Sequence, residues 1–334
     1  MTATFTNPPG IAIEDAPVET QTIAIELSNS QGKRYDGTGD PLIVQAAWTH
    51  TIPRTARGKG TNTSPQLVTM PKSERVWFGE LAAEREHQSV ANSARGKAEL
   101  ARFLLMPLLL PSDMGDLKLV MSYHSLFDRE AVDQLEAVKG FYRFTRNGSE
   151  VCCNVSDIEL VPEGMGAYWL GCEDGNLSPN LKTLAVELGY RTSEVWVIKD
   201  GEIVAGEPIE ELGVYNLAKE IADDDIIRAS ILGSVSGSAS VNPSQIAIAL
   251  KRGILAKTPQ WEMVKKPYID RWADKVLGRI LTDYSSDLNT IEQIVFSGGG
   301  AMLIRNRLTA AGFHVDRNAD TASLRGAYRY ATRS

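Results

Sequence analysis

The sequence predicts an α/β protein built from two related domains with a cleft between them. The strand opening I-A-I-E-L-S-N at residues 23–29 returns as L-A-V-E-L-G-Y at residues 184–190, so that Glu26 and Glu187 lie 187 − 26 = 161 positions apart. The expected order of elements, a β-meander followed by helices, a strand and a helix, also occurs twice. A chain of 334 residues is long enough for two domains.

The first half is expected to begin with strands and to end with a helix. Alternating apolar residues and turn signals predict strands at 23–33 (a hairpin), 42–48, 67–70, 75–78, 117–123, 141–145 and 151–160. Apolar periodicity predicts helices at 90–110 and 128–138. A further helix is expected from residue 161 with Pro162 in its first turn, where a missing N–H costs nothing.

The second half is expected to repeat this order. Strands are predicted at 183–188, 193–199, 202–205, 292–296 and 313–315, with Asp200-Gly201 as a hairpin turn. Helices are predicted at 209–222, 225–232, 243–253, within 260–288, at 301–311 and from about 321. We therefore assign 1–21 to a flexible N-terminal tail, 22–168 to the first domain, rejoined by a C-terminal helix at 320–334, and 169–319 to the second domain.

The composition excludes some classes of function. A formal net charge of −7 argues against direct binding to nucleic acid, which needs a basic surface, so any action on DNA is expected to use an adaptor. Three cysteines without metal or disulfide spacing predict buried or half-buried thiols and a reducing, cytoplasmic location. No apolar run is long enough to form a transmembrane segment.

Each copy of the repeated opening places an acid at the end of a strand and a turn of small residues after it. Ser28, Asn29 and Ser30 form the first turn, and Gly189 opens the second. Such turns can present backbone N–H groups to a phosphate while the acid reaches the accompanying metal. A third segment, 297–301, contains three glycines, opens a helix, and would let the backbone approach a nucleoside closely.

Five motifs, in order along the chain, resemble those of one family. They are E-L-S-N-S-Q-G-K at 26–33, V-P-E-G-M-G-A at 161–167, E-L-G-Y-R-T-S-E at 187–194, V-F-S-G-G-G-A at 295–301 and S-L-R-G-A-Y-R-Y at 323–330. The chain resembles the actin-like ATPases, and among them the ParM-type filament proteins of bacterial plasmid segregation. The resemblance covers residues from about 23 to the C-terminus.

The resemblance implies two actin-like (ribonuclease H-like) domains with an interdomain nucleotide cleft that binds ATP or GTP with Mg²⁺. It places Glu26 and Glu187 at the metal and makes Glu163 and Glu187 the catalytic residues, with Glu163 positioning the attacking water. The implied nucleotide-binding residues are Ser28, Asn29, Ser30, Lys33, Gly189, Tyr190, Arg191, Thr192, Gly298, Gly299, Gly300 and Ala301.

Three residues depart from the family pattern. Glu26 and Glu187 stand where the family prefers Asp, and Ser28 stands where it prefers Gly. Each Glu is one methylene longer, so its carboxylate must sit differently around a Mg²⁺ that demands octahedral geometry. The charge that holds the metal is kept, so nucleotide binding is expected, whereas hydrolysis is expected to be slow.

The resemblance implies a protein that polymerises into filaments with ATP and Mg²⁺ and hydrolyses ATP to control filament turnover. Such a filament is expected to move or position plasmid DNA through a small adaptor protein, either DNA-binding or membrane-linked. One alternative is a chromosomally encoded cytoskeletal filament that acts on cell shape. Another is a small-molecule kinase of the same superfold, which would need a catalytic Asp facing an acceptor hydroxyl, and no motif for one is evident.

Overall fold

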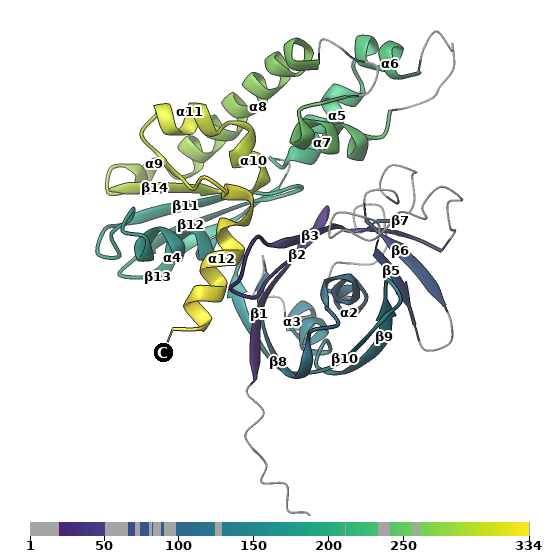
Figure 1. Ribbon diagram of the computed structural model, residues 1–334. Coiled ribbons are helices and arrows are strands. Elements are labelled where there is room, and N and C mark those ends of the chain that lie inside the picture. The colour runs from purple at the N-terminus through teal and green to yellow at the C-terminus, as the bar shows by residue number, and fades with distance from the viewer. Residues whose placement is uncertain are drawn as a thin grey trace, which may run out of the picture.

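A computed structural model describes residues 20–50, 66–70, 74–79, 82, 88–89, 98–123, 129–210, 212–232, 241–255, 258 and 261–333. These residues form two β-sheets surrounded by helices (Figure 1). Of the tail expected at 1–21, residues 1–19 lie outside the described residues. In the described part of the chain, no helix combines the length and the apolar character needed to cross a membrane.

The first sheet has ten strands in the order β3-β2-β1-β8-β10-β9-β5-β6-β4-β7. Its opening strands form an antiparallel meander, and β8 then pairs in parallel with β1. The strands are β1 (Gln21–Leu27), β2 (Gln31–Tyr35), β3 (Leu42–Gln45), β4 (Ala47–Thr49), β5 (Gln66–Thr69), β6 (Arg75–Phe78), β7 (Gln88–Ser89), β8 (Met114–Tyr123), β9 (Gly140–Arg146) and β10 (Ser149–Pro162).

The second sheet has five strands in the order β13-β12-β11-β14-β15. They are β11 (Thr183–Leu188), β12 (Ser193–Lys199), β13 (Glu202–Ile209), β14 (Gln293–Ser297) and β15 (His314–Val315). An antiparallel meander is again followed by a strand that pairs in parallel with its first member. The repeat expected from the sequence is therefore present in the strand order of both sheets.

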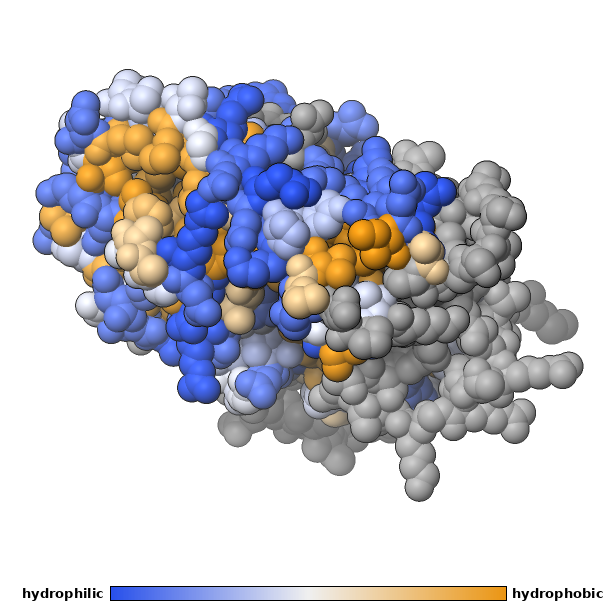
Figure 2. Space-filling model, turned by 90° about the horizontal axis from the view of Figure 1, so that it is seen from above, coloured by the Kyte–Doolittle hydropathy of each residue, from blue (hydrophilic) through white to orange (hydrophobic). Residues whose placement is uncertain are grey.

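The helices lie on the faces of the two sheets. The first sheet curls round α2 (Ala101–Leu105), η2 (Met106–Leu108) and α3 (Arg129–Glu136), as Figure 1 shows. The remaining helices are α4 (Met165–Glu173), α5 (Val214–Ala222), α6 (Asp225–Leu232), α7 (Pro243–Arg252), α8 (Trp261–Asp283), α9 (Ser285–Leu288), α10 (Gly298–Leu303), α11 (Arg305–Ala310) and α12 (Ala319–Ala331). Seen from above, over α8 and α11, apolar residues lie in separate patches among polar ones (Figure 2).

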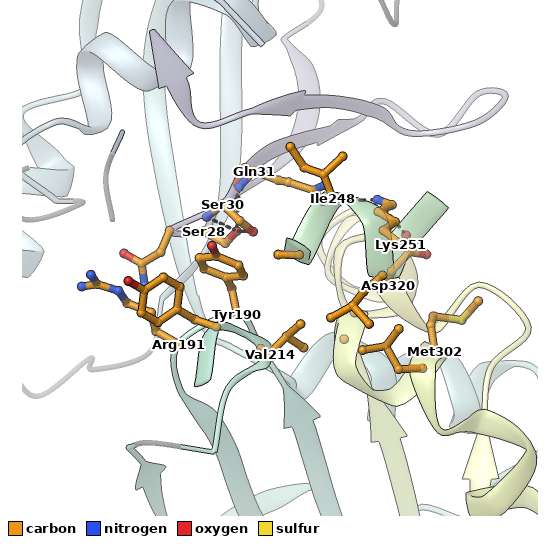
Figure 3. Close-up of a pocket in the computed structure, with 18 of the residues that line it drawn as sticks. Ser28, Ser30, Gln31, Tyr190, Arg191, Val214, Ile248, Lys251, Met302 and Asp320 are labelled. Atoms are coloured by element: carbon orange, nitrogen blue, oxygen red, sulfur yellow. Dashed lines mark hydrogen bonds and ion pairs between the residues drawn. The ribbon is translucent and has the colours of Figure 1, made fainter. Parts of the chain in front are cut away.

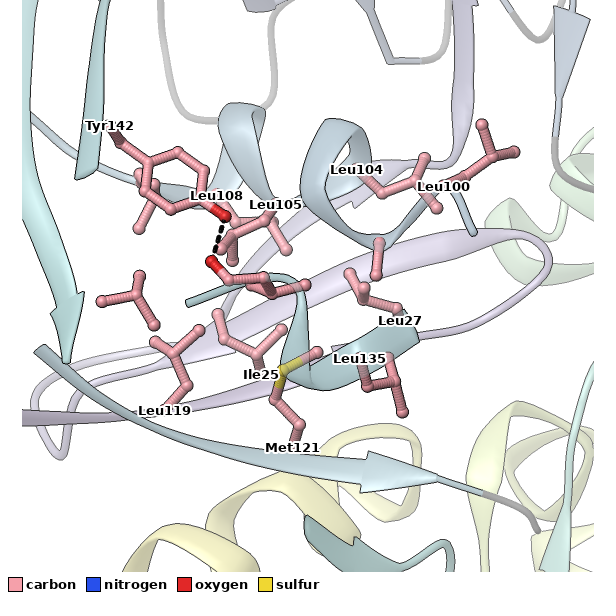
Figure 4. Close-up of a cluster of buried hydrophobic side chains, with 14 of the residues drawn as sticks. Ile25, Leu27, Leu100, Leu104, Leu105, Leu108, Leu119, Met121, Leu135 and Tyr142 are labelled. Carbon is pink, nitrogen blue, oxygen red and sulfur yellow. Dashed lines mark hydrogen bonds between the residues drawn. The ribbon is translucent and has the colours of Figure 1, made fainter. Parts of the chain in front are cut away.

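Strand β1 is buried on both of its faces, and this positions the first acid. Ile23, Ile25 and Leu27 alternate along one face and pack against the leucines of α2 and η2 inside the curled sheet (Figure 4). Ala24 points to the other face, where it packs in a cluster with residues of α12. Because Glu26 is two residues further on, its side chain shares the face of Ala24 and lies beside α12.

Two glycines allow α4 and α12 to cross at close range. A Cβ at Gly166 would lie 1.8 Å from the carbonyl oxygen of Ser323, and a Cβ at Gly326 would lie 1.8 Å from the carbonyl oxygen of Gly166. Any side chain at either position would therefore force the helices apart. Two of the five sequence motifs, 161–167 and 323–330, are thus explained by a single helix crossing.

The helix expected from residue 161 begins later. Val161 and Pro162 still pair with β8, and Pro162 ends the strand instead of opening the helix. Gly164, with φ of 90°, separates the strand from α4. The prediction was wrong because a Pro is also tolerated at a strand end, where it need not donate to the ladder.

Other expected boundaries shift as well. The helix expected at 209–222 begins at Val214, because Ile209 still pairs with Ser193 in β12. Of the helix expected at 90–110, only α2 and η2 are described as helical, and residues 90–97 lie outside the described part. The helix expected at 301–311 is divided into α10 and α11. The strand expected at 42–48 is divided into β3 and β4, and the strand expected at 202–205 extends to Ile209. The other expected helices and strands are present with small shifts of their ends.

The cysteines follow the alternation of a strand. Cys153 is buried, Cys172 is half-buried and Cys152 is exposed. The expectation that all three thiols are at least half-buried is therefore wrong for Cys152, because neighbouring residues in β10 point to opposite faces.

Candidate functional site

A cleft of about 1250 Å³ lies between the two sheets, lined by residues of both (Figure 3). Most of the residues singled out in the sequence meet there. They are Glu26, Ser28, Asn29, Ser30, Lys33, Glu163, Glu187, Gly189, Tyr190, Arg191, Thr192, Gly298 and Gly299. Gly300 and Ala301 were expected at the site but do not line the cleft.

The first turn is closed by its own serine. The Ser28 N–H donates to the Gln31 carbonyl at 2.8 Å, and the Ser28 hydroxyl oxygen accepts from the N–H groups of Gln31 at 3.1 Å and Ser30 at 3.4 Å. The hydroxyl also donates to the Gln31 carbonyl at 3.0 Å. In this structure, N–H groups expected to meet a phosphate are satisfied within the turn.

The second turn is held from behind by the start of α5. The Gly189 N–H donates to the Thr192 carbonyl at 3.0 Å. The carbonyls of Gly189, Tyr190 and Arg191 accept from the N–H groups of residues 214, 215 and 213, at 3.1, 2.7 and 3.2 Å. The carbonyl groups of this turn are thereby fixed toward α5.

The glycine run serves mainly to seat α10 against β11. A Cβ at Gly298, where φ is 88°, would lie 2.5 Å from the Leu188 carbonyl oxygen, and a Cβ at Gly300 would lie 2.7 Å from the Leu188 Cβ. Ala301 is fully buried in the core of the second sheet. Only Gly299 faces open space, with nothing within 4 Å of a Cβ placed on it. Of these three glycines, Gly299 is therefore the one at which a ligand could approach the backbone closely.

Glu26 forms a buried ion pair with Lys33. The Lys33 Nζ donates to Glu26 Oε1 at 2.6 Å and to the Asp320 carbonyl at 2.7 Å. Both side chains are almost fully buried, and they lie opposite each other on β1 and β2. Burial lowers the pKa of Lys33, but the carboxylates of Glu26 and Glu187 outweigh it, so the pKa is raised and the ammonium stays charged.

Among the described residues, no lysine or arginine forms a direct ion pair with Glu187. Burial raises its pKa well above the usual value, and the carboxylates of Glu26 and Glu163 raise it further. Lys33 and a hydrogen bond with Ser323 act in the opposite direction. Glu187 is therefore an acid that the apo protein holds at an electrostatic cost, which is frequent at functional sites.

Glu163 lies where the two sheets meet. Its N–H donates to the Tyr123 carbonyl of β8 at 3.0 Å, and its carbonyl accepts from the indole Nε1 of Trp196 in β12 at 2.7 Å. Next to it, a Cβ on Gly164 would lie 3.2 Å from the Cβ of Glu187. The backbone of Glu163 is thus tied to both sheets, and its side chain is placed among the cleft acids.

Two acids of the cleft offer carboxylate oxygens to a divalent cation. Glu26 and Glu187 each have a buried Oε2 atom that makes no hydrogen bond within the described structure. Oxygen atoms of this kind are the ligands that Mg²⁺ prefers, with water and phosphate completing the shell. No group of three or more acidic, His or Cys side chains able to hold a metal occurs among the described residues, so the protein would supply only part of the coordination.

Three residues of the site were not anticipated from the sequence. Asp320 receives Lys33 through its carbonyl and Lys251 through its carboxylate, with 3.4 Å between Nζ and Oδ2. Ser323 accepts from the Gly164 N–H at 3.2 Å and contacts Glu187. Lys251 also reaches Gln31 across the cleft, as Figure 3 shows. Ser323 opens the motif at 323–330, which gave no sign of these contacts, and no local pattern marks Asp320 or Lys251, because each residue acts on a segment far away in the sequence.

Comparison with known proteins defines the fold. No protein-family model matches the chain, and no curated protein matches it. The archaeal actin homologue Ta0583 superposes with a TM-score of 0.72 at 16% identity, covering 94% of this chain and 100% of that one. Its complex with ADP gives 0.71 at 16% identity, with 94% and 100% covered. A ParM filament from Clostridium botulinum gives 0.72 at 16% identity, with 93% and 98% covered.

The chain therefore has the actin-like fold, as its motifs predict. The expected mixed α/β architecture with two sheets is confirmed.

Proposed function

We propose that this protein is an actin-like nucleotide-binding protein that polymerises into filaments with ATP and Mg²⁺ and hydrolyses ATP to control filament turnover. The observation that carries the proposal is the convergence of two strand-end turns, a buried lysine and three carboxylates in one cleft. Support also comes from similar structures, one of which is an ADP complex and another a ParM filament. We assign 22–168 with the C-terminal helix 320–334 to one domain and 169–319 to the other.

The two turns would hold the phosphates from opposite sides. Ser28, Asn29 and Ser30 belong to one sheet and Gly189 to Thr192 belong to the other, so a phosphate chain between them would join the two halves. Lys33 would supply positive charge, because its Nζ lies at the base of the cleft beside Glu26. Ser28 would have to release its turn N–H groups, whereas the second turn is held from the other side.

Glu26 and Glu187 would serve the metal. Their unpaired Oε2 atoms would hold Mg²⁺ through one or two contacts or through its waters, and the ion would supply the charge that balances the phosphates. The high pKa of Glu187 supports this role, since a cation near the carboxylate relieves the repulsion from Glu26 and Glu163.

Glu163 would position the attacking water. Phosphoryl transfer depends mainly on placement and on charge stabilisation, and a residue tied by its backbone to both sheets can place a water between them. Because Glu163 lies at the junction, closure of the cleft around the nucleotide would bring it into register with the phosphates. Glu187 would contribute to catalysis by holding the positive charge of the metal close to Glu163.

Self-association would be the output of nucleotide binding. We propose a cytoplasmic filament that moves or positions plasmid DNA through a small adaptor, DNA-binding or membrane-linked, since the net charge of −7 disfavours direct contact with nucleic acid. A chromosomal filament acting on cell shape would use the same assembly with a different adaptor.

The test is assembly of the purified protein with ATP and Mg²⁺. Light scattering and negative-stain electron microscopy should show filaments with ATP or a non-hydrolysable analogue, and phosphate release should accompany their turnover. Omitting nucleotide provides the control. A protein that stays monomeric over a wide concentration range while it binds nucleotide would contradict the filament and favour the small-molecule kinase.

A further inference from the structure

Arg305 is a cation in the wall of the cleft with a buried donor that makes no hydrogen bond in the described structure. It opens α11 and lines the same cleft as the two turns. Its Nε atom is buried and makes no hydrogen bond, and no carboxylate of the described residues pairs with its guanidinium. A buried polar group without a partner is unusual in a folded protein and calls for an explanation.

The other cations that line the cleft are already engaged. The pairs, each between a lysine or arginine and an acid, are Lys33 with Glu26, Lys251 with Asp320, Lys265 with Glu262, Lys266 with Asp270 and Arg307 with Asp274. Arg191 lies over the ring of Tyr215, 5.7 Å from its centre. Within the described lining, Arg305 is therefore the cation that pairs with neither an acid nor an aromatic ring.

The cleft that Arg305 lines also offers apolar side chains to a flat group. Val214, Ile248 and Met302 project into it (Figure 3). Met302 and Met263 line it while remaining 39% and 68% exposed. Thioethers make favourable contacts with aromatic rings, so two exposed methionines beside a cleft favour an aromatic ligand. A nucleotide whose phosphates lie at the two turns would extend its base into this compartment.

We propose that Arg305 recognises the base and makes the cleft select guanine nucleotides over adenine nucleotides. This inference rests on the proposed nucleotide function and makes GTP, in place of ATP, the nucleotide that the cleft prefers. Guanine presents two acceptors side by side, O6 and N7, and a guanidinium carries only donors that match both. Adenine presents N7 beside the N6 amino group, so its donor would face a second donor. Arg305 therefore favours guanine through geometry and not only through charge.

The experiment compares affinities for diphosphates with Mg²⁺, which avoids hydrolysis. Displacement of a fluorescent nucleotide should show GDP binding roughly 10- to 100-fold more tightly than ADP. IDP, which keeps O6 and N7 but lacks the 2-amino group, should bind like GDP. 7-Deaza-GDP, which lacks N7, should lose most of the advantage. Loss of affinity with IDP and none with 7-deaza-GDP would overturn the proposal, because a different edge of the base would then be read.

The second part of the experiment measures the same ratio of GDP to ADP affinity in variants of Arg305. Arg305→Gln offers one donor and one acceptor, which match adenine N6 and N7, so the ratio of GDP to ADP affinity should fall by at least roughly tenfold. Arg305→Met should remove the preference without reversing it. Arg317→Gln removes the same charge from an exposed position outside the cleft and should leave the ratio unchanged.

The outcomes separate this inference from the proposed function. Equal binding of GDP and ADP by the wild-type protein, or an unchanged ratio in both Arg305 variants, would overturn the role of Arg305 and leave nucleotide binding intact. Failure of every nucleotide to bind would overturn the proposed function as well.

Discussion

The two halves of the cleft end their central strands with the same acid but place a different residue opposite it. Glu26 lies opposite Lys33, whereas Glu187 lies opposite Glu194. Lys33 binds Glu26 directly, whereas the pKa of Glu187 is raised well above its usual value. The same strand order thus supports two electrostatic states. The charge of Glu26 is neutralised by Lys33, whereas the repulsion around Glu187 would be relieved by a bound cation.

The turns that follow these two acids are also held in different ways. The first is closed by the Ser28 hydroxyl, which accepts from two N–H groups of its own turn. The second is fixed through its carbonyls by residues 213–215. The second turn is therefore fixed by its backbone, while the first turn would have to exchange an internal hydrogen bond of Ser28 for one to an anion. Substitutions at Glu163, at Lys33, at Glu187 and in the two turns test this comparison.

Glu163, tied to both halves, should give the largest effect. Glu163→Ala should slow phosphate release by about 10²–10⁴-fold, since a positioned water is lost, while nucleotide binding and assembly stay nearly intact. Filaments should persist longer, which electron microscopy over time can measure. Glu163→Gln keeps the size of the side chain and one acceptor oxygen but removes the charge, and so separates the effect of charge from that of shape. An unchanged rate in Glu163→Ala would make Glu163 only a junction residue.

Removing Lys33 should make the first half resemble the second. Lys33→Met leaves Glu26 buried beside Glu187 without its cation, so the free energy of unfolding should fall by about 3–5 kcal/mol. Urea denaturation measures the change. The double variant Lys33→Met with Glu26→Gln removes both charges and should recover most of the loss. A double variant as unstable as the single one would show that the lysine contributes through packing instead of charge.

Neutralising Glu187 should stabilise the protein without ligand. Because its pKa is raised in the folded state, the folded protein binds this proton more tightly than the unfolded chain, and stability falls as the pH rises above the ordinary value of 4.5. Glu187→Gln cannot ionise, so it should melt at a higher temperature than wild type at about pH 8 and equally at about pH 4.

The melting comparison is made in EDTA, which removes divalent cations. Glu202→Gln, on an exposed position of β13, is the control and should show no difference at either pH. A wild-type protein as stable as Glu187→Gln at the higher pH would contradict the electrostatic difference between the two halves.

The turns should give the smallest effect. Ser28→Ala removes the acceptor of two N–H groups, and the free energy of unfolding should fall by about 1 kcal/mol. Thr192→Val removes a hydroxyl from the second turn that accepts no turn N–H and donates to Glu194 at 3.3 Å, so it should cost less. Thermal unfolding of both variants measures the contrast, and equal losses would contradict it.

Local patterns in the sequence predicted most of the fold. The strands from 183 to 199 and the turn at Asp200-Gly201 are confirmed, because alternation and turn residues act over short distances. Pro162 was misplaced since its own pattern fits both a helix start and a strand end, and pairing with β8 decided between them. The role of Gly300 was likewise misread, because only the packing of α10 on Leu188 shows what its missing Cβ allows.

The predicted site is brought together in part. Residues of both turns line one cleft, whereas Gly300 and Ala301 do not. The functions of these residues and the domain limits at 168 and 319 stay predictions. The sequence marked Ser323 only as the first residue of the motif at 323–330 and offered no sign of Asp320 or Lys251, since an aspartate or a lysine on a helix surface is common.

What the sequence determined by itself is the repeated strand, acid and turn, with the apolar face of each strand. These features depend on backbone propensity and on alternation between neighbours, which are local. What only the tertiary structure decided is the charge state of the cleft. Lys33 meets the Asp320 carbonyl 287 positions along the chain, and Gly166 meets Gly326 in a helix crossing. Such contacts join segments that are distant in sequence, so their energies appear only when both sheets have formed.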